Sequence, residues 1–454
     1  MTVQDPRSRD VIPLREATRA WFSISLQTFG GPAGQIAVMQ HKLVDEKRWI
    51  GQRRFLHALN YCMLLPGPEA QQLAIYTGWL LNGSLGGLIA GTLFVLPGVV
   101  ALLALSAVYV GFGDVGFVSA VFAGISPAVI AIVLQAVHRV GSRALRHRLL
   151  IALAVLSFVA LAAFKVPFPI VVLGAGVFGW LAGLRIRALG EPAAHGKSDG
   201  PEPLVSDELL HHARPSLRRT FSILVGGSVL WLAPVGILAL VLGRDATIVH
   251  EGLFFSGTAL ITFGGAYAVL SYVAQQAVHV YGWLAPNEMV RGLGLAESTP
   301  GPLIMVVQFV AFLGAYRSPG SLDPWVAAVL GSLAVTWATF VPCFVLVLVG
   351  APYVERLRSN RHLTAALTAI TASVVGVIAN LAVFFALHTL FTRTRVITPG
   401  PLHLELPVLS SASGEAFAIT AVCLVAIFRL TWGPLRVLGT GAALGVGWWL
   451  ISLL

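Results

Sequence analysis

The chain has 454 residues, of which 56% are hydrophobic and only 11% are charged. A soluble domain carries roughly twice that charged fraction, so the composition excludes a water-soluble globular protein and predicts an all-α polytopic membrane protein. The formal charge of +10 does not indicate a nucleic-acid partner. The basic residues cluster in short loops between apolar runs, where they orient a membrane protein.

Residues 1–13 are polar and basic, and we interpret them as a cytoplasmic tail because no cleavable signal peptide follows. The long apolar runs downstream can each cross about 30 Å of hydrocarbon, which needs roughly 20 residues. These runs are 88–110, 117–137, 221–242, 325–350 and 363–390. A stretch rich in Pro, Gly and charge, 188–219, is predicted to be a cytoplasmic linker, and 220–242 a connecting transmembrane helix.

The two sides of this linker are copies of one unit. Phe29-Gly30-Gly31 recurs as Phe263-Gly264-Gly265, and Pro66-Gly67-Pro68 recurs as Pro300-Gly301-Pro302, both at an offset of 234 residues (300 minus 66). One shared offset across separate motifs indicates an internal repeat. We therefore predict two transporter repeats, 14–187 and 248–454.

The charges of matched loops indicate that the repeats are inverted. Residues 41–54 carry five Lys or Arg and the matched 275–288 carry none, whereas 354–361 carry three and the matched 111–116 carry none. Positive residues mark the cytoplasmic side, so the second copy has the opposite orientation and the N-terminus is cytoplasmic. Inverted repeats are a transporter architecture.

The same rule bears on the glycine and proline motifs. If 15–40 crossed the membrane, the basic loop 41–54 would lie opposite the basic N-terminus. All basic loops share one side if 15–40 and 55–81 each enter, break and return. We therefore expect two broken or re-entrant helical hairpins and about four transmembrane helices in each repeat; full spanning, with a charge violation, is the alternative.

Breaks of this kind are tolerated in lipid only where they are buried in protein or line a polar cavity. Proline favours the first position of a helix, so helices are expected to begin after Pro32, Pro68 and Pro302. Their free N–H groups and partial positive charge suit an oxyanion. The candidate substrate-binding residues are Gly30, Gly31, Gln35, Gly67, Glu69, Gln71, Gln72, Gly264, Gly265, Glu297, Ser298, Thr299 and Gly301. Packing kinks and helix capping, by Thr299 for example, are the structural alternatives.

Glu69 opens a predicted helix, where a carboxylate suits the helix dipole. A carboxylate beside a divalent anion would repel it, so we hypothesise that Glu69 is protonated when the anion is bound, with protons as the coupling ion. No metal or cofactor is expected, because Cys62, Cys343 and Cys423 stand alone in apolar runs without paired spacing.

Four stretches resemble the chromate ion transporter family in its long, two-domain form. They are FGGPAGQIAVMQ (29–40), LLPGPEAQQLAIYTGWLLNGSLGGLIAGTLFVLPG (64–98), FGGAYAVLSYV (263–273) and GLGLAESTPGPLIMVVQFVAFLGAY (292–316). The resemblance implies a multi-pass inner-membrane transporter with antiparallel domains that expels chromate, with sulfate as a competing anion. Chromate and sulfate are both tetrahedral dianions, and a cage of N–H donors accepts either.

Other function classes fit less well. An enzyme is not expected, because the chain has no HExxH, GxSxG or nucleotide-binding loop. An anion channel, or an exporter of another small anion such as sulfate, would share a site at helix ends and is the alternative function. Small-residue surfaces such as GVVALLALSAVYVG (98–111) allow packing within the chain or in a homodimer.

Overall fold

Long apolar helices make up most of this computed structural model, which describes residues 11–183, 203–205, 210, 216–263, 265–353 and 361–454. Within these residues, six helices are long and apolar enough to cross a membrane. Each of the five predicted apolar runs falls inside one of them, which confirms an all-α polytopic membrane protein. Most of the predicted tail 1–13, most of the predicted linker 188–219 and most of the basic loop 354–361 lie outside the described residues.

The helices before the linker follow the predicted breaks. They are α1 (Leu14–Ser25), α2 (Gly31–Gln40), the π-helical η1 (His41–Glu46), α3 (Gln52–Cys62), α4 (Glu69–Phe112), α5 (Gly116–Ala144), α6 (Arg148–Ala162) and α7 (Phe168–Ala182). The connecting helix is α8 (Leu217–Leu242).

The second half presents the same order of elements. These are α9 (Thr247–Leu260), α10 (Ala266–Gln275), the π-helical η3 (Gln276–Val280), α11 (Pro286–Ser298), the 3₁₀ turn η4 (Leu303–Met305), α12 (Val306–Arg317), α13 (Pro324–Gly350), the 3₁₀ turn η5 (Ala351–Tyr353), α15 (Arg361–Leu390), α16 (Gly414–Phe428) and α17 (Pro434–Ser452). Even the π-helical ends of α2 and α10 fall at matched positions, so the repeat extends from sequence to local backbone.

Helix α4 is a helical hairpin, because its backbone leaves the helical region at Asn82 and Gly83. Its two arms touch through glycines: a methyl group on Gly78 would meet the carbonyl of Gly86. Close backbone contact of this kind is how small residues join helices in lipid. The short arm before Asn82 and the long arm after it correspond to α12 and α13 of the second repeat.

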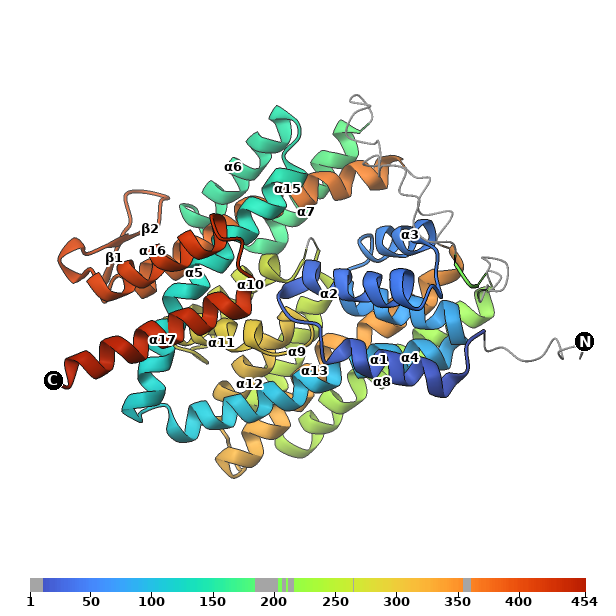
Figure 1. Cartoon of the computed structure of the whole chain (residues 1–454), viewed down its shortest axis with the longest axis horizontal. Helices are drawn as coiled ribbons and strands as arrows, with labels where there is room; N and C mark the ends of the chain where they lie inside the picture. The colour runs from blue at the N-terminus through green and yellow to red at the C-terminus, as the bar shows by residue number, and fades with distance from the viewer. Residues whose placement is uncertain (1–10, 184–202, 206–209, 211–215, 264, 354–360) are drawn as a thin grey trace, which may run out of the picture.

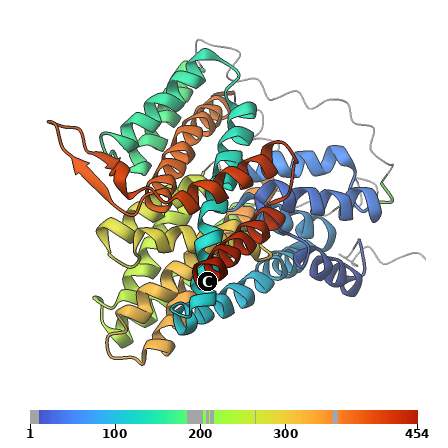
Figure 2. The ribbon, with the colours of Figure 1, turned by 60° about the vertical axis from the view of Figure 1, so that its left-hand side comes forward.

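The long helices of each repeat pack on the other repeat. Helix α5 lies against α16 and α17, and α15 lies against α6 and α7, as Figures 1 and 2 show. Glycines again set the distance, since a methyl group on Gly124 would strike the Gly441 carbonyl and one on Gly376 would strike the Ala154 carbonyl. The two halves therefore form one interlocked body.

Two features lie at the periphery. Helix α8 packs on α13 and α9 but buries only Val235, so most of its apolar side chains are exposed, as expected for a lipid-facing helix. A small antiparallel hairpin of β1 (Thr394–Ile397) and β2 (Leu404–Pro407) precedes α16. The sequence analysis missed this hairpin, although a Pro-Gly turn between two short strands was an available signal.

Candidate anion-binding site

The four glycine and proline motifs do interrupt helices. Gly30, Gly67, Gly265 and Gly301 adopt positive φ angles of 79°, 118°, 99° and 101°, a region that glycine enters without steric cost. Helix α4 begins directly after Pro68 and η4 directly after Pro302, as predicted. Helix α2 begins at Gly31, one residue before Pro32.

The breaks of one repeat bind those of the other. The Gly67 N–H donates to the Thr262 carbonyl at 2.8 Å, and the Gly301 N–H donates to the Thr28 carbonyl at 2.9 Å. The offset of 234 residues relates Gly67 to Gly301 and Thr28 to Thr262, so these two hydrogen bonds are equivalent. Matched residues of the two halves therefore contact each other reciprocally. We call these two contacts the crossings.

The crossings consume the N–H groups of Gly67 and Gly301, so these two donors are not free for an anion. Free donors remain in the first turns of the helices that start beside them. Helices α2, α4 and α10 have no side-chain hydrogen bond at their N-caps, where a polar side chain commonly satisfies one of the unpaired N–H groups.

Several buried amides around the crossings lack partners among the described residues. Gln71 is fully buried, and neither its Oε1 nor its Nε2 has a hydrogen bond. Gln72 donates to the Pro66 carbonyl at 2.6 Å and Gln35 to the Gly301 carbonyl at 2.5 Å, while the Oε1 of each is unpaired. Buried polar groups are nearly always bonded, so three such amides on helices beside the breaks indicate a site for a polar ligand.

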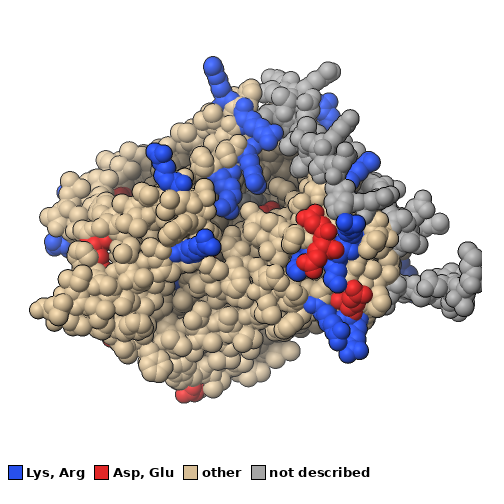
Figure 3. Space-filling model, viewed as in Figure 1, with Lys and Arg blue, Asp and Glu red and all other residues tan. Residues whose placement is uncertain are grey.

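Two carboxyl groups and two arginines complete the surroundings. Glu297 accepts a hydrogen bond from the Tyr267 hydroxyl, and its Oε2 is buried without a partner. Glu69 opens α4, and Arg139 and Arg143 lie one turn apart on α5. Figure 3 shows Lys and Arg side chains along one side of a hollow in this face, with a small acidic patch inside it.

The sequence did not mark either arginine as part of a site, because neither belongs to a broken segment. They lie on α5, far along the chain from the motifs, and no local signal connects them. An i, i+4 pair of arginines near the end of an apolar helix was the only available hint.

The remaining candidates have other partners. The hydroxyls of Ser298 and Thr299 donate to the Leu295 and Ala296 carbonyls, so in this structure they bond the end of their own helix. Gly31 has a positive φ of 75°, and Gly264 lies outside the described residues. In the described part of the chain, no three His, Cys, Asp or Glu side chains gather as a metal site would require.

Comparison with known proteins assigns this architecture to a family. The family profile named Chromate transporter matches residues 15–180 and 251–446. The chain is 32% identical over 366 residues to a chromate transport protein of Pseudomonas aeruginosa, covering 79% of this chain and 77% of the relative. It is 25% identical over 374 residues to a chromate transport protein of Cupriavidus metallidurans, covering 82% of each.

A more distant relative, an uncharacterized transporter of Methanocaldococcus jannaschii, is 23% identical over 371 residues, covering 81% of this chain and 83% of the relative. No solved structure matches the chain. These relatives and the apolar helices both indicate a membrane transporter rather than an enzyme. The chain belongs to the chromate transporter family.

Proposed function

We propose that this chain is a secondary transporter that exports chromate from the cytoplasm, with sulfate and related tetrahedral oxyanions as competitors. The pair of crossings supports this proposal. At each crossing a broken segment of one repeat is hydrogen-bonded to the other repeat, and the helix N-termini beside it have no side-chain cap. A transporter site of this type lies at the repeat interface and uses half-helix N-termini to bind an anionic group.

In this proposal the anion is held by neutral donors. The first-turn N–H groups of α4 and the amide of Gln71, which has no partner among the described residues, supply hydrogen bonds, with Gln35 and Gln72 beside them. Neutral donors bind a dianion without trapping it as a buried cation would. Arg143, which is exposed, and Arg139, which is half-buried, would raise the local concentration of anions.

We further propose that repeats 14–187 and 248–454 are inverted, with 188–219 a cytoplasmic linker and 220–242 the connecting span. The loop charges support this orientation, and the reciprocal hydrogen bonds suit a two-fold axis between the copies. The motifs then form re-entrant hairpins near the midplane. The protein would lie in the inner membrane with its N-terminus in the cytoplasm.

Glu69 is proposed as a proton-coupled residue at this site. A carboxylate in the first turn of α4 would repel a bound dianion, so anion binding favours the protonated acid. Replacing Glu69 with Gln should therefore preserve anion exchange and remove the pH dependence of anion binding. Unchanged pH dependence would refute this role for Glu69.

The proposed function is tested by uptake into everted membrane vesicles. Chromate should enter vesicles that contain the protein, sulfate should compete, and vesicles preloaded with either anion should take up the other faster. An anion channel, the alternative, would show no such counterflow and a flux that follows voltage without saturation. Absence of chromate uptake with retained sulfate uptake would make the chain an exporter of another anion.

A further inference from the structure

A further buried carboxyl group, Glu251, has not been assigned a role in the proposed site. Glu251, on α9, has no exposed surface, and neither of its carboxylate oxygens has a hydrogen bond within the described residues. Burying an ionised carboxylate without a partner costs several kcal/mol or more. We therefore interpret the Glu251 side chain in this structure as the neutral, protonated acid.

Glycines make the space for this carboxyl group. A methyl group on Gly314 of α12 would strike Oε1 of Glu251, and one on Gly331 of α13 would lie 3.0 Å from Oε2. The same methyl group on Gly314 would lie 3.0 Å from the ring of Trp283. Glu251 thus occupies a niche bounded by two glycines and an aromatic ring, which offers no charge.

The charged groups on the surrounding elements do not neutralise it. They are Arg244 and Asp245 before α9, His250 on α9, Arg218 and Arg219 at the far end of α8, Arg317 on α12, Glu288 on α11 and Asp323 before α13. Arg317 and Glu288 form a bidentate pair with N–O distances of 2.6 and 2.8 Å. Val235 of α8 packs against Gly252 of α9, the residue that follows Glu251.

The first repeat shows that the fold does not need this acid. At the offset of 234 residues, Glu251 and Gly314 correspond to Ala17 and Leu80, which are both buried. The first repeat thus has a buried alanine and a buried leucine at the positions where the second repeat has an acid and a glycine. A neutral packing solution therefore exists for the same architecture, and the second repeat does not use it.

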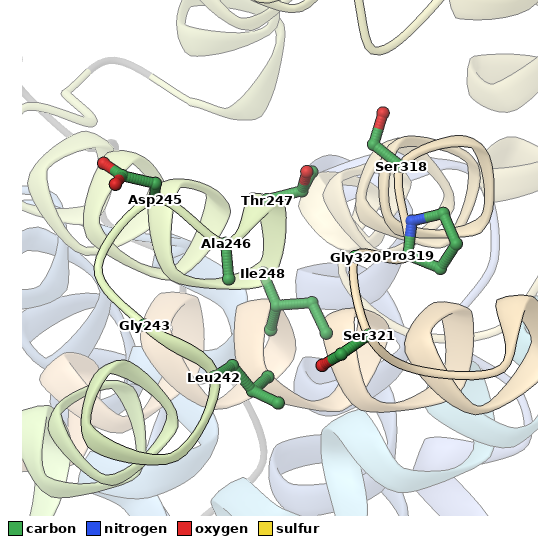
Figure 4. Close-up of a pocket in the computed structure, with 10 residues that line it drawn as sticks. All are labelled: Leu242, Gly243, Asp245, Ala246, Thr247, Ile248, Ser318, Pro319, Gly320 and Ser321. Atoms are coloured by element: carbon green, nitrogen blue, oxygen red, sulfur yellow. The ribbon is translucent and has the colours of Figure 1, made fainter.

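A cavity of about 410 Å³ opens between the α8–α9 and α12–α13 turns, on the side of α9 that leads to Glu251. Figure 4 shows Ile248 at its floor and Asp245, Thr247 and Ser318 around it. Ile248 precedes Glu251 by three residues, which is about 4.5 Å along a helix. Ile248 and Ala315, the neighbour of Gly314, belong to one small apolar cluster.

We propose that Glu251 is a proton-binding site, loaded from this cavity, that couples proton movement to transport. A proton is the one cation that a single carboxylate can bind alone, whereas Ca²⁺ or Mg²⁺ needs about six oxygen ligands. Among the described residues, no three His, Cys, Asp or Glu side chains gather in a way that could hold a metal ion. Ile248 and Ala315 act as the barrier that opens when the site exchanges its proton.

The first test is chemical and does not depend on the transported anion. Dicyclohexylcarbodiimide reacts with protonated carboxyl groups in apolar surroundings, and mass spectrometry locates the product. In the purified full chain, Glu251 should be labelled in mildly acidic buffer and progressively less as the buffer becomes alkaline. Glu405, which is paired with His388 at 3.0 Å, should stay unlabelled as an internal control. Absence of labelling, or labelling that ignores buffer pH, would overturn the proposal.

The second test rests on the proposed function and uses transport. Glu251→Gln keeps the shape of the acid, and the double variant Glu251→Ala/Gly314→Leu rebuilds the pair found in the first repeat. Both should lose the stimulation of chromate uptake by an imposed proton gradient and keep anion counterflow. Gly257→Ala, on the same helix with open space around it, is the matched control and should behave as wild type.

Retention of gradient stimulation in either folded Glu251 variant would overturn the coupling role. A sodium gradient that replaces the proton gradient, with sensitivity to the same variants, would overturn the choice of ligand. If the wild type moves no chromate, the proposed function fails while the labelling result still decides whether Glu251 exchanges a proton.

Discussion

Gln71 provides the sharpest test of the anion site, because its amide is buried with neither polar atom bonded in the described structure. Methionine occupies the matched position of the second repeat, Met305, and is buried there. Gln71→Met therefore introduces a side chain that the same architecture already accommodates. Methionine is also as good a helix former as glutamine, so the start of α4 should be unaffected.

The expected effects on stability and on binding have opposite signs. An unsatisfied buried polar group costs about 1–3 kcal/mol, so the ligand-free variant should be more stable by about that amount. A hydrogen bond to a charged ligand contributes about 1.5–3 kcal/mol, and each 1.4 kcal/mol is tenfold in affinity. Chromate should therefore bind about 10- to 100-fold more weakly.

Thermal unfolding of the purified protein measures both quantities. The melting temperature without anion reports stability, and its rise with chromate or sulfate concentration reports affinity, because a ligand stabilises the state that binds it. Gln308→Met is the matched control. Gln308 donates to the Val99 carbonyl at 3.0 Å and accepts from Thr336, so its replacement should lower stability and leave affinity unchanged.

A Gln71→Met protein that binds chromate as tightly as wild type would refute the placement of this amide in the site. A variant that is less stable without anion would refute the premise that the amide is unsatisfied.

Three further predictions follow from local geometry. Gly67→Ala forces a Cβ into a backbone with φ of 118°, which costs about 1–3 kcal/mol. Transport and melting temperature should therefore both fall. Gly236→Ala, on α8 with open space around it, is the control and should change neither. Arg143→Gln should raise the KM for chromate several-fold and weaken the salt dependence of uptake, with kcat retained, and an unchanged KM would contradict the steering role. The His388 hydrogen bond lowers the pKa of Glu405 from 4.5 to about 2. The pair therefore stabilises the folded state above pH 4.5, and this stabilisation is lost as pH falls toward 2. The melting-temperature difference between wild type and Glu405→Gln should shrink over that range, and a constant difference would contradict the prediction.

The sequence predicted the membrane class and the helix starts after Pro68 and Pro302 because both depend on local chemistry. A low charged fraction leaves too little polar surface to face water, and the apolar runs at 117–137 or 363–390 need only their own length to qualify as spans. Glycine and proline end a helix through their own backbone constraints, so Gly67 and Pro68 marked the start of α4 without reference to any partner.

The tertiary structure decided which groups meet. Gly67 bonds Thr262 and Gly301 bonds Thr28, and these pairings join residues 195 (262 minus 67) and 273 (301 minus 28) positions apart, which no local pattern specifies. The same holds for Glu251, whose unpaired state depends on two glycines on other helices. Composition and backbone propensity act on neighbours along the chain, whereas hydrogen-bond partners and buried charge depend on how distant segments pack.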